Sequence, residues 1–200
     1  MAVDIKKCTW KNLRRLQRIM YETFYETFKH QNSLTQMNAH LDKTCNLQQL
    51  GKEVSNDTSP FFLVTYQHEL VGYVKVNTHD TRSEKTNNES LEIERLYIKK
   101  RFQKYDLGRH LLNKAIEIAI EHRKKKVRIG VWEQNKNAIA FYKKMKFVQT
   151  GSRSFHIEDE EHRELILTLY DVRASFCRSF SDSIFLPQKR VNGAISTVCQ

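Results

Sequence analysis

The sequence predicts an α/β (α+β) fold, because segments with strand-like and helix-like apolar patterns follow one another along most of the chain. The clearest case runs from Leu91 to Leu112. Residues 91–98 alternate, imperfectly, between apolar and charged side chains, which predicts a half-buried strand. After a short basic connection, apolar residues recur at helical spacing, at Leu107, Leu111, Leu112, Ala115 and Ala119.

The first part of the chain is predicted to hold one strand and three helices. Residues 3–7 can form the strand, and Thr9 is a suitable N-cap for a helix over residues 10–29. Ser33 can cap a second helical segment, and residues 47–54 offer a third. The longest helix is expected to bury an apolar stripe made of Leu13, Leu16, Met20, Phe24 and Phe28.

The elements around the central unit follow from turn residues and apolar runs. Strand patterns at residues 61–66 and 70–77 are joined by a tight turn at 67–69, and the polar residues 78–88 are predicted to be an exposed loop. The cations of residues 122–126 are expected to end the central helix. The later elements are a strand at 127–132, a helix at 135–145, and a closing hairpin of residues 147–155 and 164–170 across 156–163.

Size and composition favour one domain that binds an anion. Two hundred residues suit a single domain with a sizeable core. No run of about 18 apolar residues and no apolar leader occurs, so we expect neither a membrane span nor a signal peptide. Four cysteines without a paired motif, and histidines without ligand spacing, predict a reduced cytoplasmic protein without a metal.

The net charge of +11 suggests an anionic cofactor or nucleic acid. Because the basic residues are spread along the chain and no nucleic-acid-binding motif is visible, nucleic acid is not the expected partner. We expect residues 1–170 to form the domain and residues 171–200 a mobile C-terminal extension, since no apolar period is sustained after Tyr170. A partner-binding segment and an accident of the reading frame both fit this extension.

The connection at residues 99–109 is rich in cations and leads into a helix. Free backbone N–H groups and the positive end of the helix dipole face outward there, which predicts an anion site, most naturally for phosphates. Its sequence Gln103-x-x-Asp106-x-Gly108 resembles the Gln/Arg-x-x-Gly-x-Gly/Ala motif of the GNAT acetyltransferases. Aspartate replaces the first glycine of that motif.

A second stretch, residues 135–147, is similar to the GNAT pattern Asn-x-x-Ala-x-x-Phe-Tyr-x-Lys-x-Gly-Phe. Lys146 stands where the pattern has its glycine. The resemblance covers residues 3–169, and its details are closest to bacterial spermidine/spermine N-acetyltransferases. The matching residues are Asn135, Ala138, Phe141, Tyr142, Lys144 and Phe147.

The resemblance implies the GNAT fold, a mixed, mostly antiparallel, twisted sheet of six to seven strands flanked by helices, with acetyl-CoA as co-substrate. The backbone of Leu96, Tyr97 and Ile98 would pair with the pantetheine arm like an added strand, and an N–H near Ile98 would polarise the thioester carbonyl. The other implied coenzyme contacts are Gln103, Lys104, Tyr105, Asp106, Leu107, Gly108 and Arg109 for the pyrophosphate, and Asn135, Tyr142 and Lys144 along the arm.

Acetyl transfer needs a neutral amine, a polarised carbonyl and a proton for the departing thiolate. The resemblance assigns that proton to Tyr142, whose phenol is a donor at neutral pH. Glu92, six residues before Ile98, matches the offset of a catalytic glutamate in the histone-acetylating branch of the family, and Glu94 lies on the same strand face. Either carboxylate can act as the base, directly or through water. No cysteine lies in the motifs, which favours direct attack.

The acceptor is expected to be a small-molecule primary amine, with a polyamine as the first candidate and a protein or peptide amine as the second; a homodimer is compatible with either. The rival interpretation is a weakly active, coenzyme-A-binding pseudoenzyme. Asp106 and the C-terminal extension motivate it. A carboxylate among phosphates is repelled, although Arg101, Lys104 and Arg109 can offset the repulsion. The acidic residues 158–161 fit either a site for a cationic substrate or a solvated turn.

Overall fold

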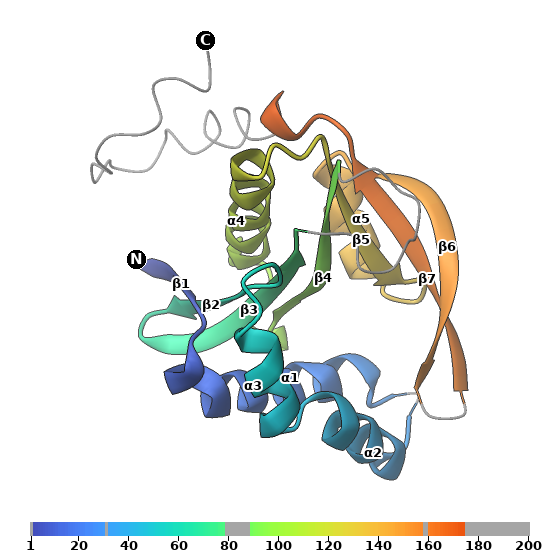
Figure 1. Ribbon diagram of the computed structural model, residues 1–200. Helices are drawn as coiled ribbons and strands as arrows, with labels where there is room; N and C mark the ends of the chain where they lie inside the picture. Colours follow the sequence, from blue (N-terminus) through green and yellow to red (C-terminus); the bar gives the residue numbers. More distant parts are fainter. Residues whose placement is uncertain (1, 31, 79–88, 158–159, 175–200) are drawn as a thin grey trace.

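A seven-stranded sheet in the order β1-β2-β3-β4-β5-β7-β6 forms the centre of the molecule, with helices on both faces (Figure 1). The computed structural model describes residues 2–30, 32–78, 89–157 and 160–174. Neighbouring strands run antiparallel, except that β4 and β5 are parallel. The predicted mixed and mostly antiparallel sheet is therefore confirmed.

The first elements begin at the predicted caps. Thr9 donates from its N–H and its hydroxyl to Asn12 Oδ1, at 3.1 and 3.0 Å, and Ser33 Oγ accepts from the Gln36 N–H at 3.2 Å. The turn after Thr9 is a 3-10 turn, so the long helix starts three residues later than predicted. These elements are β1 (Val3–Lys7), η1 (Trp10–Asn12), α1 (Leu13–Phe28), α2 (Leu34–Thr44) and α3 (Leu47–Val54).

The next strands are β2 (Phe61–Tyr66) and β3 (Glu69–Asn77), joined by the predicted tight turn. Gln67 and His68 both take a left-handed backbone, with φ of 49° and 66°, as a two-residue hairpin turn requires. The prediction of an exposed loop from residue 78 is wrong at Thr78, which is buried and donates from its N–H and hydroxyl to the Thr58 carbonyl. Residues 79–88 lie outside the described residues.

The imperfect alternation in β4 (Ser90–Ile98) has a structural cause. Ile93 pairs with Val76 and Arg95 with Lys75, so Glu94 is an extra residue in β4, a β-bulge. The bulge shifts the phase of the strand by one residue. Leu96 and Ile98 therefore return to the same core as Leu91 and Ile93.

The remaining elements differ from prediction mainly at their ends. Lys126 opens β5 instead of closing the central helix, which ends at Glu121. The hairpin strands run through most of residues 156–163, which were predicted to connect them; polar cross-strand pairs such as Arg153–Glu164 hide these strands in the sequence. The elements are η2 (Lys100–Phe102), α4 (Leu107–Glu121), β5 (Lys126–Trp132), α5 (Lys136–Lys144), β6 (Val148–Ile157) and β7 (Glu160–Leu169).

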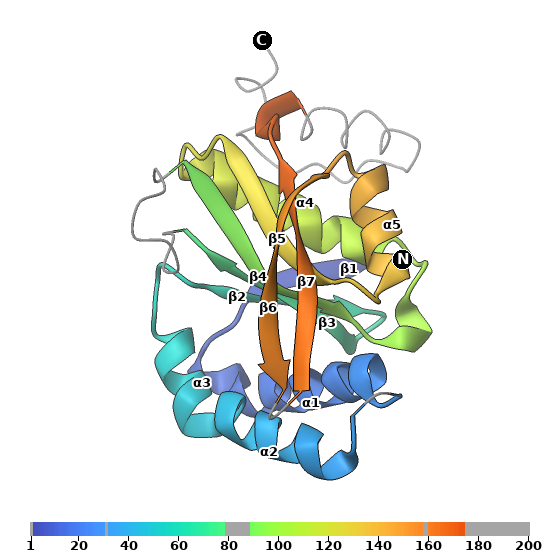
Figure 2. The same ribbon diagram turned by 90° about the vertical axis from the view of Figure 1, so that its right-hand side faces the viewer.

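Each face of the sheet has its own core. Helices α4 and α5 lie on one face, and α1, α2 and α3 gather on the other (Figure 2). The first core includes the whole predicted stripe of α4, whose five residues are at most 1 % exposed. The second core contains Leu16, Ile19 and Met20 of α1 together with the free cysteines Cys8 and Cys45.

The predicted boundary near residue 170 lies at the end of β7. Val172, just beyond it, is buried against the core of α4, and residues 175–200 lie outside the described residues, so the mobility of the extension stays a prediction. None of the helices in the described ranges combines the length and apolar content needed to cross a bilayer. Within the same ranges, no group of acidic, histidine or cysteine side chains is arranged to hold a metal ion.

Candidate active site

The parallel strands β4 and β5 separate part of the way along. They pair only from Ser90–Lys126 to Ile93–Ile129, although β4 continues to Ile98 and β5 to Trp132. The bulge at Glu94 comes directly after the last pair. A gap therefore opens within the sheet, and one edge of β4 faces it without a partner strand.

Two residues of β4 direct their backbone groups into this gap. The Lys99 N–H donates to the Val71 carbonyl at 2.9 Å, and successive residues of a strand point their backbone groups to opposite sides. Ile98 and Leu96 therefore face the gap, whereas Tyr97 faces β3. Gln103 Nε2 donates to the Ile98 carbonyl at 3.3 Å, which ties the start of the next loop to this edge.

Gly72 on β3 is required by the close approach of β4. A Cβ at this position would lie 2.5 Å from the Tyr97 carbonyl oxygen and 2.4 Å from Ile98 Cδ1. Both distances are shorter than van der Waals contact. Any larger residue would push the edge of β4 toward the gap.

The loop from β4 to α4 is held open by two left-handed residues. Lys104 has φ of 73° and Asp106 has φ of 62°, and Asp106 is the N-cap residue of α4 although its side chain makes no capping bond. The first helical bonds come from the N–H groups of Arg109 and His110. The N–H groups of Leu107 and Gly108 precede these bonds and can receive an anion.

The negative charge of Asp106 is balanced by a cation of its own turn. Arg109 Nε lies 3.0 and 2.8 Å from the two carboxylate oxygens of Asp106, and a second nitrogen of the guanidinium lies 2.6 Å away. Of the three cations predicted to offset this charge, Arg109 does so, while Arg101 pairs with Glu69. Aspartate thus adopts the backbone conformation for which the motif uses glycine.

An aromatic cluster supports the same loop from outside. The Tyr105 ring, 57 % exposed as a residue, lies with its centroid 5.8 Å from that of Tyr66 and 6.2 Å from that of Phe102. The Arg101 guanidinium lies over Phe102 at 4.9 Å. These contacts fix the loop between its two left-handed residues.

Helix α5 presents the second motif. Asn135 is its N-cap, with Oδ1 accepting from the Ala138 N–H at 3.1 Å, and the exposed Lys144 is its last residue. Tyr142 is only 3 % exposed and packs edge-on to Phe141 and Phe147. Burial raises the pKa of Tyr142 well above its usual value, with a further contribution from Tyr97, so the phenol stays protonated.

The two candidate bases on β4 have different surroundings. Glu94 lies 2.8 Å from Lys75 and 3.4 Å from Arg95, and accepts from Asn77 Nδ2 at 2.9 Å. Burial alone would raise the pKa of Glu94, but the charges of Arg95 and Lys75 and the hydrogen bonds outweigh it and lower the pKa. Glu94 is therefore a structural ion-pair partner and a weak base.

Glu92 is held more loosely at the closed end of the gap. Its carboxylate lies 3.4 Å from Asn77 Nδ2 and 3.4 Å from a guanidinium nitrogen of Arg153, and its side chain is 17 % exposed. It belongs to the pairs that precede the separation of β4 and β5. Of the two carboxylates, Glu92 thus has the longer contacts to its polar partners.

The sequence reasoning missed the cations that surround these carboxylates. Lys75, only 7 % exposed as a side chain, bridges Glu94 and Glu53 at 2.8 Å each. A charged residue inside the apolar run of residues 70–77 was the signal that could have identified it. No comparable signal marks Arg153, whose partners are 11 and 61 positions away.

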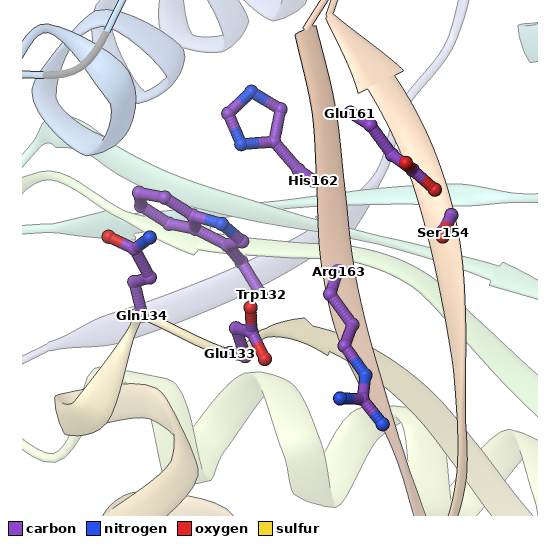
Figure 3. Close-up of a pocket in the computed structure, with 7 residues that line it drawn as sticks. All are labelled: Trp132, Glu133, Gln134, Ser154, Glu161, His162 and Arg163. Atoms are coloured by element: carbon purple, nitrogen blue, oxygen red, sulfur yellow. The ribbon is translucent and has the colours of Figure 1, made fainter.

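An open pocket of about 290 Å³ lies at the end of β5, next to the β6–β7 hairpin (Figure 3). The indole of Trp132 packs edge-on against the His162 ring, with ring centroids 5.9 Å apart. Its centroid lies 5.1 Å from that of Phe28 on α1. The pocket is lined by both acidic and basic side chains. Its lining is Trp132, Glu133, Gln134, Ser154, Glu161, His162 and Arg163.

Comparison with known proteins agrees with this geometry. The sequence matches the Acetyltransferase (GNAT) family over residues 13–147. It is 34 % identical over 166 residues to an uncharacterised N-acetyltransferase in the pepI 3′ region of Lactobacillus delbrueckii subsp. lactis, covering 83 % of this chain and 96 % of that one. The chain therefore belongs to the GNAT acetyltransferase family.

Solved structures share the fold. The PaiA N-acetyltransferase of Thermoplasma acidophilum, in complex with coenzyme A, superposes with a TM-score of 0.70 at 20 % identity, over 85 % of this chain and 99 % of that one. The ribosomal-protein-S18-alanine N-acetyltransferase of Escherichia coli gives a TM-score of 0.61 at 14 % identity, over 85 % and 95 %. The protein is thus an N-acetyltransferase of GNAT type that uses acetyl-CoA.

Proposed function

We propose that this enzyme acetylates a small-molecule primary amine by direct attack on acetyl-CoA, with a polyamine as the first candidate acceptor. The observation that carries the proposal is the gap between β4 and β5, which opens directly after the last paired residues of the two strands, Ile93 and Ile129. The pantetheine arm would lie in this gap as an added strand, on the backbone groups of Leu96 and Ile98. That the PaiA structure contains coenzyme A supports a coenzyme site in this fold.

The phosphates would bind where α4 begins. The N–H groups of Leu107 and Gly108, together with the loop over residues 103–106, face the pyrophosphate in this proposal, with Lys144 and Arg109 as nearby cations. Asn135 would hold the arm from α5. The left-handed backbone of Asp106 and its pairing with Arg109 support a functional loop despite the missing glycine.

The reaction would run through one tetrahedral intermediate, formed by addition of the amine and broken down by loss of the thiolate. The amine nitrogen attacks the thioester carbon while a backbone N–H of β4 stabilises the oxyanion. Glu92, directly or through a water, removes a proton from the nitrogen. As the carbon–sulfur bond breaks, the Tyr142 phenol gives its proton to the thiolate. Neither Cys8 nor Cys45 belongs to the two motifs, and both are buried in the opposite core, which favours direct attack over an acyl-enzyme.

The acceptor side supports an amine that carries positive charge. Glu133 and Glu161 line the pocket at the end of β5, and Trp132 adds an aromatic face that can lie against a cation. These groups suit a polyamine on a protein whose net charge of +11 would otherwise repel it. A protein or peptide amine is the second candidate, because the S18-alanine enzyme of Escherichia coli acts on such a group.

An amine panel with detection of free coenzyme A tests the proposal. The panel contains spermidine, a diamine, a monoamine of equal length and a peptide with a free N-terminus. We expect turnover with the amines and the highest kcat/KM for spermidine. Tight binding of acetyl-CoA with no turnover on any amine would instead support a coenzyme-binding pseudoenzyme.

A further inference from the structure

Arg153 links two carboxylates from different strands of the sheet. It lies on β6, and its Nε donates to Glu164 Oε1 on β7. A second nitrogen of the same guanidinium lies 3.4 Å from Glu92 Oε1 on β4. Because β5 and β7 lie between β4 and β6 in the sheet order, this side chain crosses two strands to reach Glu92.

Gly130 makes this crossing possible. A Cβ on Gly130 would lie 2.3 Å from Glu164 Oε2 and 2.6 Å from its carboxylate carbon. The Glu164 carboxylate therefore lies directly against the backbone of β5. Gly130 follows Ile129, the last residue of β5 that pairs with β4, so this contact sits where the gap begins.

The three charged groups are largely shielded from solvent. The exposed fractions of their side chains are 35 % for Arg153, 17 % for Glu92 and 16 % for Glu164. Burial alone would lower the pKa of Arg153, but its bonds to Glu164 and to Glu92 raise it, so the guanidinium stays charged. A carboxylate in such a place needs a fixed cation to keep its charge and its orientation.

Glu92 and Glu94 differ in how tightly they are held. Glu94 contacts two cations and an amide, with the shortest distance 2.8 Å. Glu92 contacts the Arg153 guanidinium at 3.4 Å and the Asn77 amide at 3.4 Å. The longer contact with Arg153 can orient the Glu92 carboxylate without the close ion pairs that hold Glu94.

We propose that Arg153 is a positioning residue for acetyl transfer. It holds the Glu92 carboxylate toward the closed end of the gap, and Glu164, seated over Gly130, holds Arg153 in turn. The inference rests on the proposed function, with Glu92 as the base. It assigns a role to three residues outside the two motifs, on strands that follow the central unit in the sequence.

The test compares Arg153→Gln, Arg153→Lys and Glu164→Gln with the wild type. Steady-state kinetics with the best amine give kcat and KM over a range of pH, and calorimetry gives the affinity for coenzyme A. We expect Arg153→Gln to lower kcat by about 10- to 100-fold, a fraction of what general-base catalysis contributes. Lysine keeps the charge and should recover most of that loss. The affinity for coenzyme A should not change.

The pH profile distinguishes positioning from mere support of the fold. Without a neighbouring cation a carboxylate is protonated more readily, so the acidic limb of the kcat/KM profile should move to higher pH in Arg153→Gln. In an enzyme that already carries Glu92→Gln, adding Arg153→Gln should cost little more activity, because the two residues act as a unit. Arg18→Gln, on the exposed side of α1, is the matched control and should behave as wild type.

Gly130→Ala tests the same contact without removing a charge. The new methyl group displaces the Glu164 carboxylate and so loosens Arg153. We expect the acidic limb to move in the same direction as in Arg153→Gln, by a smaller amount, for both Gly130→Ala and Glu164→Gln. Unchanged kcat and pH profile in these variants would overturn the role of Arg153, as would a loss of activity that only follows a loss of thermal stability. A wild-type enzyme that acetylates no amine would instead refute the proposed function itself.

Discussion

In the proposed site, the coenzyme side and the acceptor side of the gap are built from different kinds of groups. On the coenzyme side, backbone geometry dominates: the open edge of β4, two left-handed residues and the first turn of α4. On the acceptor side, around the proposed base Glu92, buried and partly buried ion pairs dominate. They set Lys75, Arg95 and Arg153 against Glu53, Glu92, Glu94 and Glu164. Backbone geometry suits a cofactor that never changes, whereas side chains can vary with the acceptor.

This contrast predicts which substitutions alter chemistry and which alter stability. A change on the coenzyme side should affect turnover or coenzyme affinity and leave folding nearly intact. A change in the ion pairs should affect folding as well. The following predictions test that division, from the largest expected effect to the smallest.

Tyr142→Phe removes the proposed proton donor and keeps the packing of its ring against Phe141 and Phe147. We expect kcat to fall by about 100- to 10,000-fold, the range for general acid catalysis, with little change in coenzyme affinity or melting temperature. Steady-state kinetics and calorimetry measure both. Tyr170→Phe, at an exposed tyrosine, is the control, and equal activity in the Tyr142 variant would remove the acid role.

Lys75→Met breaks the buried bridge between Glu53 and Glu94 and leaves both carboxylates with Arg95 as their remaining shared cation, at 3.8 and 3.4 Å. Removing one partner of a buried ion pair typically costs about 3–5 kcal/mol, so we expect the free energy of unfolding in urea to fall by that amount. Lys7→Met is the matched control, because its pair with Asp57 is exposed and such pairs contribute at most about 1 kcal/mol. Equal losses in both variants would contradict the division.

Asp106→Gly restores the residue that the motif uses and removes a carboxylate from the proposed phosphate site. We expect the dissociation constant of coenzyme A to fall by up to about tenfold, which corresponds to 1.4 kcal/mol. Glycine also accepts the left-handed φ of 62° without strain, so stability should not suffer. Weaker coenzyme binding in calorimetry would show instead that Asp106 serves the site by orienting Arg109.

The lowered pKa of Glu94 gives the smallest effect. Because the pKa is lower in the folded protein than the ordinary value of 4.5, this carboxylate stabilises the fold fully above about pH 4.5. The stabilisation is lost as the pH falls through the lower folded-state value. Urea titrations between pH 6 and pH 3 should show a steeper loss for wild type than for Glu94→Gln. Parallel curves would contradict this origin of acid sensitivity.

The sequence predicts most of the elements around the proposed coenzyme site, because their signals are local. The strand, the loop and the helix of residues 91–112 form one continuous pattern, and α5 carries its motif within a dozen residues. Even the irregular alternation around Glu94 was visible, although only the pairing with β3 identifies it as a bulge. The prediction that the exposed loop begins at residue 78 is wrong at Thr78, because its hydrogen-bond partner Thr58 is far away in sequence.

The ion pairs of the acceptor side could not be predicted, because their contacts join residues that are distant in sequence. Glu92 meets Arg153, and Lys75 meets Glu53, only when distant strands and helices come together. From the sequence alone, a single charged residue in a strand is predicted to be exposed to solvent, although tertiary packing can bury it. The long polar strands of the β6–β7 hairpin were shortened in the prediction because their cross-strand charges resemble those of a turn.

The short pairing of β4 with β5 also bears on the mechanics of the whole domain. Four residue pairs join β1–β4 to the three-stranded ribbon of β5, β7 and β6 within the sheet. This is the shortest strand pairing in the sheet, and a coenzyme lying along it would connect its two sides. We therefore expect the unliganded enzyme to open locally between β4 and β5. Amide protons of these two strands should exchange faster without the coenzyme than with it.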